Sequence, residues 1–269
     1  MPRFLVVVEY DGTDFRGSQV QATGRTVQGE LQTAASTLAG SEVACVLAGR
    51  TDSGVHASAQ VASFDLVREI VAERLERALN GLLPRDVSVR EVAVAPDEFH
   101  PRFWARARRY RYVILNRRAR SALRDRYVWH CAELLDAEAM QRAGSALLGR
   151  RDFRAFGKPP QGGNTCRTIS RLDVQRRGET VTVAVEADAF LRRMVRLLVG
   201  ALVDVGRGKL EAARLGRLVA EDGRSPSPAL PAKGLTLEAV AYERERLGRG
   251  IGLWWSSDPL EPPIDVTTP

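Results

Sequence analysis

The chain has 269 residues, of which 44 % are hydrophobic and 27 % are charged, a composition typical of a globular protein with one or two domains. No apolar run approaches the roughly 18–20 residues that a membrane-spanning helix needs, so we expect no membrane partner. The net charge of +7 favours a polyanionic partner, although nearly all of it comes from arginine, which a GC-rich genome would also produce. Cys45, Cys131 and Cys166 are odd in number and far apart, which suits a reducing cytoplasm and predicts neither a disulfide framework nor a metal site.

The first half of the chain alternates strand and helix patterns. Periodicity and turn residues predict the order β-α-β-β-α-β, with elements over residues 4–10, 27–38, 43–48, 55–64, 67–79 and 87–94.

The second half repeats this order. Strands are predicted over residues 109–116, 172–174, 181–185 and 235–242, and helices follow Asp136, cover 190–205 and lie near 210–220. The sequence therefore predicts an α+β protein with two ferredoxin-like (RRM-like) domains, residues 1–104 and 105–248. We expect their antiparallel sheets to lie side by side with helices on one face and an active-site cleft between the domains. Residues 249–269 are expected to form an irregular tail.

One loop concentrates polar chemistry. Residues 48–57 read AGRTDSGVHA and join two predicted strands, with Asp52 at the tip between Arg50 and His56. The flanking glycines allow a tight turn that presents a carboxylate. An ordinary polar turn would use the same residue types, with the aspartate bonding nearby backbone amides.

Two further segments combine arginine with apolar residues. Residues 99–112 interleave aromatic residues and arginines, which suits base stacking with phosphate contact, or an amphipathic strand with Tyr110 and Tyr112 in the core. Residues 189–200 form a helical pattern with Arg196 at the edge of its apolar stripe. A partly buried arginine requires a carboxylate partner, unless its stem only covers the helix flank.

Together these segments resemble the tRNA pseudouridine synthase A (TruA-type) family. Residues 49–56 closely resemble its G-R-T-D-A-G-V-H signature, residues 99–112 its central stretch, and residues 190–200 its F-x-x-x-M-V-R-x-x-V-G motif. Residues 234–237 are similar to its G-L-x-L strand, and the resemblance runs from about residue 4 to 242. The sequence departs from the family at Ser18, where a tryptophan is common.

The resemblance implies isomerisation of uridine to pseudouridine in the anticodon stem-loop of tRNA (tRNA positions 38–40), by a cytoplasmic homodimer without cofactor or metal. It implies that Asp52 is the catalytic nucleophile, that Tyr110 stacks on the uracil and assists proton transfer, and that Arg196 pairs with Asp52. The implied substrate-binding residues are Arg50, His56, Arg109, Tyr110 and Leu237.

Two other classes of protein are compatible with parts of the pattern. A non-catalytic RNA-binding protein with RRM-like domains would not need a carboxylate at the centre of an anionic ligand's site. A metal-dependent hydrolase built on Asp52 and His56 would need further ligands, and His100 and His130 lack an obvious spacing.

Overall fold

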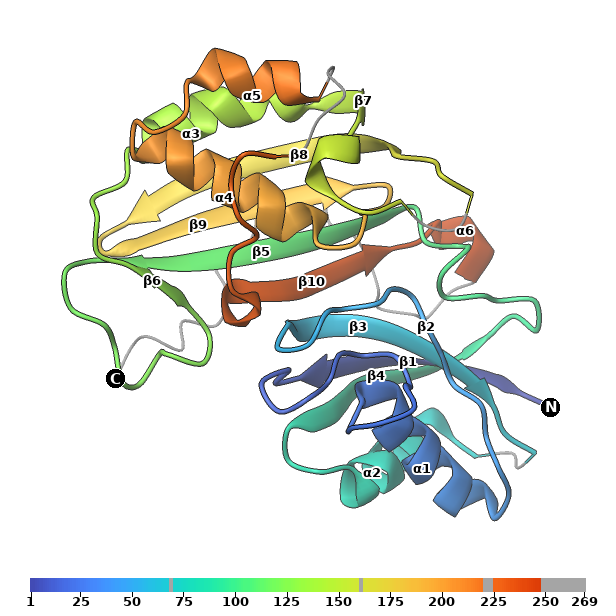
Figure 1. The fold of residues 1–269 in the computed structure, drawn as a ribbon. Helices are drawn as coiled ribbons and strands as arrows, with labels where there is room; N and C mark the ends of the chain where they lie inside the picture. The colour runs from blue at the N-terminus through green and yellow to red at the C-terminus, as the bar shows by residue number, and fades with distance from the viewer. Residues whose placement is uncertain (68–69, 160–161, 220–224, 248–269) are drawn as a thin grey trace.

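The computed structural model describes residues 1–67, 70–159, 162–219 and 225–247 (Figure 1). They form an α+β fold built on one large, mostly antiparallel, open sheet. The predicted tail, residues 249–269, lies outside the described residues.

The first half of the chain contains the predicted succession of elements. Its N-terminal helix begins after Thr26, whose side chain accepts a hydrogen bond from the backbone amide of Gly29, as an N-cap residue does. The elements are β1 (Arg3–Tyr10), α1 (Val27–Ala39), β2 (Val46–Leu47), β3 (His56–Asp65), α2 (Ala72–Leu82) and β4 (Val87–Ala95).

The second half adds two short strands, β6 and β7, that periodicity did not predict. Its elements are β5 (Ala107–Asn116), β6 (Trp129–Cys131), α3 (Ala137–Gly144), β7 (Gly149–Asp152), β8 (Cys166–Arg177), β9 (Thr180–Ala187), α4 (Met194–Gly206), α5 (Ala212–Leu218), β10 (Leu235–Ala241) and α6 (Arg244–Leu247). The helix predicted to start at Phe190 starts only at Met194. Arg193, just before it, has φ 65° and a left-handed backbone that interrupts the helix.

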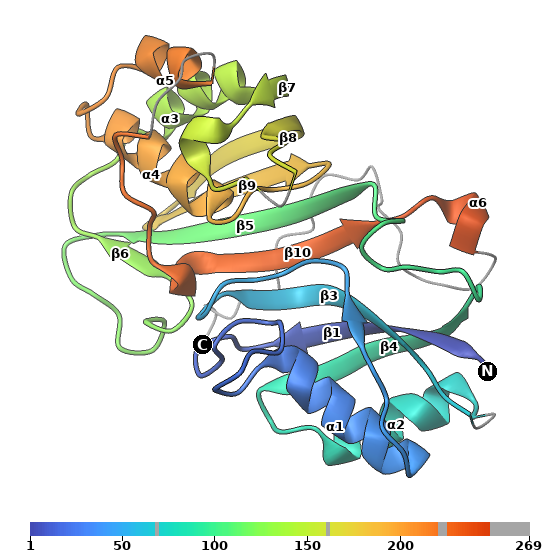
Figure 2. The ribbon, with the colours of Figure 1, turned by 45° about the vertical axis from the view of Figure 1, so that its right-hand side comes forward.

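The sheets predicted to lie side by side form one continuous sheet across both halves. Its strand order is β4-β1-β3-β10-β5-β9-β8-β7, with β2 paired to β3 and β6 paired to β5. The last strand, β10, joins the halves because it pairs in parallel with β3 and antiparallel with β5 (Figure 2). This junction places Leu237 beside Ala57 on one side and beside Tyr110 on the other.

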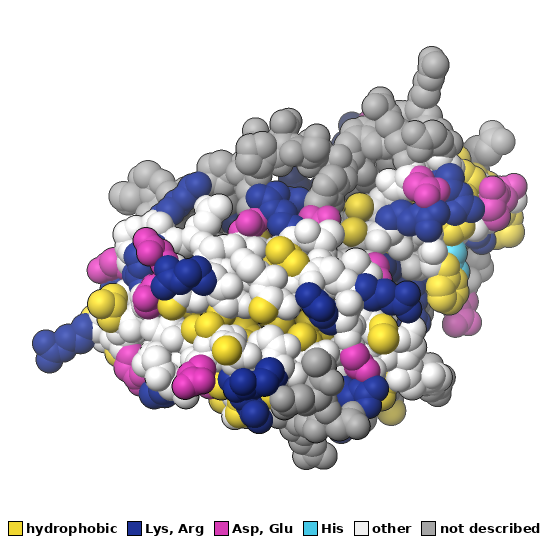
Figure 3. Space-filling view, turned by 90° about the horizontal axis from the view of Figure 1, so that it is seen from above, with side chains coloured by type: hydrophobic (Ala, Val, Ile, Leu, Met, Phe, Trp, Pro, Cys, Tyr) yellow, Lys and Arg dark blue, Asp and Glu magenta, His cyan; other side chains and the backbone are white. Residues whose placement is uncertain are grey.

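In Figure 1, α1 and α2 lie on the near side of the sheet by β1 and β4, α3 and α4 lie on the same side over the strands of the second half, and α5 packs on α3. One connected set of buried apolar side chains runs through both halves. None of the helices in the described ranges is long and apolar enough to span a membrane. On the face seen in Figure 3, arginines and lysines are spread over the surface and interspersed with acidic side chains.

Candidate active site

The Asp52 loop, residues 48–55, connects β2 to β3 as a tight turn. The backbone amide of Val55 donates to the Asp52 carbonyl at 3.1 Å, and Gly54 has φ 79°, a left-handed conformation that glycine adopts without strain. The Asp52 side chain is 23 % exposed. The turn therefore fixes the backbone of Asp52 and leaves its carboxylate accessible to solvent.

The loop that follows β1, residues 11–18, packs against the Asp52 loop. A Cβ on Gly12 would lie 2.0 Å from the Val55 carbonyl oxygen, so only glycine allows this approach. Ser18 is fully buried; its hydroxyl accepts from the Thr51 amide at 2.9 Å, and its own amide donates to the Thr51 carbonyl at 3.2 Å. Ser18 thus fixes the backbone beside Asp52.

Arg196 forms the ion pair with Asp52 that the sequence predicted. Its Nη1 lies 3.0 Å from Oδ2 of Asp52, and its Nε donates to the Leu230 carbonyl at 2.6 Å. Arg196 is in the first turn of α4, and its side chain is 15 % exposed. A second guanidinium, that of Arg192, is 71 % exposed and lies 4.0 Å from Oδ1 of Asp52. The carboxylate is therefore flanked by positive charge on both oxygens.

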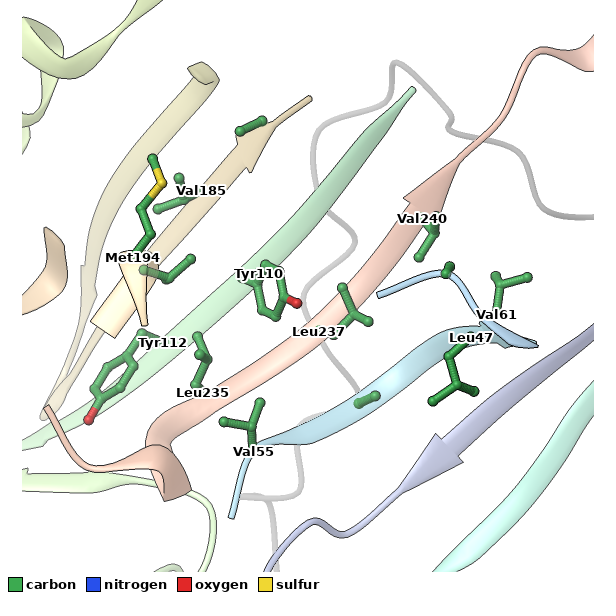
Figure 4. Close-up of a cluster of buried hydrophobic side chains, with 14 of the residues drawn as sticks. Leu47, Val55, Val61, Tyr110, Tyr112, Val185, Met194, Leu235, Leu237 and Val240 are labelled. Atoms are coloured by element: carbon green, nitrogen blue, oxygen red, sulfur yellow. The ribbon is translucent and has the colours of Figure 1, made fainter. Parts of the chain in front are cut away.

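Tyr110 and Leu237 are neighbours on β5 and β10, in the apolar cluster drawn in Figure 4. Tyr110 is 8 % exposed and Leu237 is fully buried. The Phe190 ring meets the Tyr110 ring edge-on, with centroids 5.1 Å apart and an interplanar angle of 88°. Burial raises the pKa of Tyr110 above its ordinary value, and the nearby charge of Asp52 acts in the same direction, so the phenol stays protonated at neutral pH.

His56 is buried beside the site, with 4 % of the residue exposed. Its Nδ1 accepts from the Gly12 amide at 3.0 Å, and its Nε2 lies 3.0 Å and 3.2 Å from the carbonyls of Arg126 and Lys233. Nδ1 also lies 3.1 Å from Oδ1 of Asp11. Both ring nitrogens are engaged by the protein, so His56 holds three segments of the chain together.

Two other predicted substrate-binding residues differ in position. Arg109 alternates with Tyr110 along β5, so it projects from the opposite face of the sheet, where it pairs with Glu186 at 3.4 Å. Arg50 is exposed, two residues before Asp52 on the same loop. The structure therefore brings Asp52, Arg196, Tyr110, Leu237 and Arg50 to one region and separates Arg109 from it.

Comparison with known proteins identifies the family of this chain. The chain matches the family model described as tRNA pseudouridine synthase over residues 6–103 and 143–243. It is 47 % identical over 248 residues to tRNA pseudouridine synthase A of Acidiphilium cryptum, covering 90 % of this chain and 97 % of the relative. The corresponding proteins of Methylobacterium nodulans and Myxococcus xanthus are 45 % and 43 % identical, covering 92 % and 90 % of this chain and 98 % and 92 % of the relatives.

The chain belongs to the tRNA pseudouridine synthase family. It is therefore an isomerase that converts uridine in tRNA to pseudouridine. The Asp52 loop, the first turn of α4 and strand β10 meet in one place although they are far apart in sequence.

Arg108, which the sequence did not single out, contacts the start of the Asp52 loop. Its Nη2 donates to the carbonyls of Arg102 at 2.7 Å and Ala48 at 3.1 Å, and its Nη1 donates to the carbonyl of Asp188 at 2.8 Å. Burial lowers the pKa of Arg108 from its ordinary value. One guanidinium thus ties the start of the Asp52 loop to the segment before Phe190. Its position in an alternating Tyr/Arg strand was the available signal, because residues of one parity share a face.

The metal-hydrolase alternative finds no support in the side-chain geometry. In the described part of the chain, no three His, Cys, Asp or Glu side chains come together as metal ligands. Asp52 and His56 have separate partners, since Asp52 pairs with Arg196 whereas Asp11 lies 3.1 Å from Nδ1 of His56.

Proposed function

We propose that this synthase isomerises uridine in the anticodon stem-loop of tRNA, with Asp52 as the nucleophile and no cofactor. The observation that carries the proposal is the Asp52 carboxylate, which is partly exposed and 3.0 Å from the Arg196 guanidinium. An ionised, positioned carboxylate is the form needed for nucleophilic catalysis.

The chemistry is an internal exchange of bonds. The bond from uracil N1 to ribose C1′ breaks, a bond from C5 to C1′ forms, C5 loses a proton and N1 gains one, so no electrons enter or leave. Asp52 adds covalently to the ribose or the base and is released at the end of the cycle. Arg196 stabilises the charge that returns to the carboxylate on release.

The apolar surroundings suit a uracil ring. Tyr110 stacks on the uracil and helps to move a proton from the base or the sugar. Leu237 provides an apolar wall beside it. The target nucleotide must leave its stack at a cost of a few kcal/mol, and Arg50 is placed to fill the gap or hold a phosphate.

The proposal also covers the two domains, the cellular compartment and the oligomeric state. Each half of the chain is a ferredoxin-like unit, residues 1–104 and 105–248, and the uracil binds between them. The enzyme acts in the cytoplasm as a homodimer. Sedimentation of the purified protein tests the last statement directly.

The test is conversion of an unmodified tRNA transcript in buffer with EDTA, mapped nucleotide by nucleotide for pseudouridine. Wild type should modify the anticodon arm, and Asp52→Asn should lose turnover while retaining tRNA affinity, because phosphate contacts dominate binding. Asp14→Asn, with a 68 % exposed side chain, is the matched control and should behave as wild type. Turnover by Asp52→Asn at the wild-type rate would refute the assignment of the nucleophile.

A further inference from the structure

The segment that connects β4 to β5 carries an exposed aromatic ring on a rigid base. Phe99 is 1 % exposed and meets the rings of Trp104 and Tyr242 edge-on, each at 5.5 Å between centroids. The Tyr242 hydroxyl donates to the Pro101 carbonyl at 2.7 Å, and Arg3 donates to the Phe99 carbonyl at 3.0 Å. These contacts fix the backbone of residues 99–104 from below.

Phe103 points away from this base and is 74 % exposed. The His100 ring lies against it, with centroids 4.3 Å apart and an interplanar angle of 32°, and the Arg102 guanidinium carbon is 5.7 Å from the Phe103 centroid. Nδ1 of His100 accepts from the amides of Arg102 and Phe103 at 3.2 Å and 3.3 Å, which fixes the imidazole. We call Phe103, His100 and Arg102 the Phe103 platform. Because the backbone and the His100 ring of the platform are already held, a ligand that stacks on Phe103 pays less ordering entropy.

The platform is linked to the active site through Arg108. Nη2 of Arg108 donates both to the Arg102 carbonyl and to the Ala48 carbonyl, where the Asp52 loop begins. The platform and the catalytic loop are therefore anchored to one nitrogen atom. The Phe103 platform is therefore joined to the Ala48 end of the loop that carries Asp52.

The chemistry of the platform identifies its partner. Unpaired nucleobases stack on aromatic rings and arginine planes, and arginine also attracts the phosphates on either side. The Phe103 ring is bordered by the Arg102 guanidinium and the His100 imidazole, a combination of flat and polar groups that suits a nucleobase with its phosphates.

We propose that the Phe103 platform is a stacking subsite for an unpaired nucleobase of the RNA substrate, next to the nucleotide that is isomerised. This inference rests on the proposed function, since it assumes that the RNA is bound at the Asp52 loop. It adds a residue that contributes to substrate affinity and selects RNA with an unpaired loop.

The experiment compares Phe103→Ala with Phe103→Trp, using a hairpin RNA of the anticodon arm and a fully paired duplex of equal length. Phe103→Ala should weaken hairpin binding on the order of tenfold, leave duplex binding unchanged and change the single-turnover rate at saturating RNA little. Phe103→Trp should restore hairpin binding because it retains a flat ring. Leu134→Ala, which truncates another exposed apolar side chain (82 % exposed), is the matched control.

Three results would overturn the subsite. The first is an unchanged hairpin affinity in Phe103→Ala, and the second is an equal loss of affinity for hairpin and duplex. The third is a changed sedimentation coefficient with unchanged RNA affinity, which would make Phe103 a contact between protein copies. Wild-type turnover on the same hairpin is measured in parallel. Turnover without a Phe103 effect refutes this inference alone, whereas absence of turnover refutes the proposed function.

Discussion

Replacing Arg196 tests the site most directly, because one guanidinium bonds two segments that are distant in sequence. In Arg196→Met the hydrogen bonds to Asp52 and to the Leu230 carbonyl are lost. Hydrogen bonds to charged groups contribute about 1.5–3 kcal/mol each when buried. Because Asp52 is 23 % exposed and water replaces part of its bond, we expect unfolding free energy to fall by about 2 kcal/mol and Tm by roughly 4–8 °C.

The catalytic effect of the same change should be larger than its effect on stability. Loss of one preorganised charge partner typically costs about 10²–10³ in rate. Arg196→Lys should retain part of the stability but react about tenfold more slowly than wild type, since one ammonium cannot reproduce the planar fork that addresses both acceptors.

The assay is single-turnover pseudouridine formation at saturating tRNA, with Tm of each variant measured by circular dichroism. Arg142→Lys and Arg142→Met on α3, where the side chain is 67 % exposed, are the matched controls and should match wild type in both measurements. If Arg196→Met reacts within threefold of wild type while its Tm falls, Arg196 is a packing residue and not part of the catalytic site.

Two more predictions concern the base of the site. Gly12→Ala should displace the Asp52 loop, because the new methyl group would lie 2.0 Å from the Val55 carbonyl oxygen. We expect the free energy of unfolding, measured by chemical denaturation, to fall by about 2 kcal/mol or more and the rate of pseudouridine formation to fall strongly. A fully active variant would contradict the close approach. Burial lowers the pKa of His56, so below about pH 6.5 the unfolded chain binds a proton that the folded chain excludes, and stability should fall as the pH is lowered. The fall in Tm between pH 7.5 and 5.5 should be smaller in His56→Gln than in wild type, and identical slopes would show that His56 does not titrate on unfolding.

Sequence alone determined the local features of this protein. The apolar run of β1 and the start of α3 after its N-cap Asp136 were predicted because burial periodicity and N-cap chemistry depend on neighbouring residues. The resemblance carried by residues 49–56 identified Asp52 and the family, and the expectation that Arg196 pairs with Asp52 is confirmed at 3.0 Å. An arginine at the edge of an apolar stripe requires an acidic partner, and the family motif indicated which one.

Only the tertiary structure decided how these elements meet. Periodicity records that a side chain is buried but not what covers it, so it did not predict that β10 joins both halves into one sheet or that Leu237 lies beside Tyr110. The position of His56 beside the site depends on carbonyls 70 and 177 residues away, which no local pattern reports. The opposite orientation of Arg109 follows from the strand's two-residue repeat, but only the burial of Tyr110 shows which face of β5 carries the site.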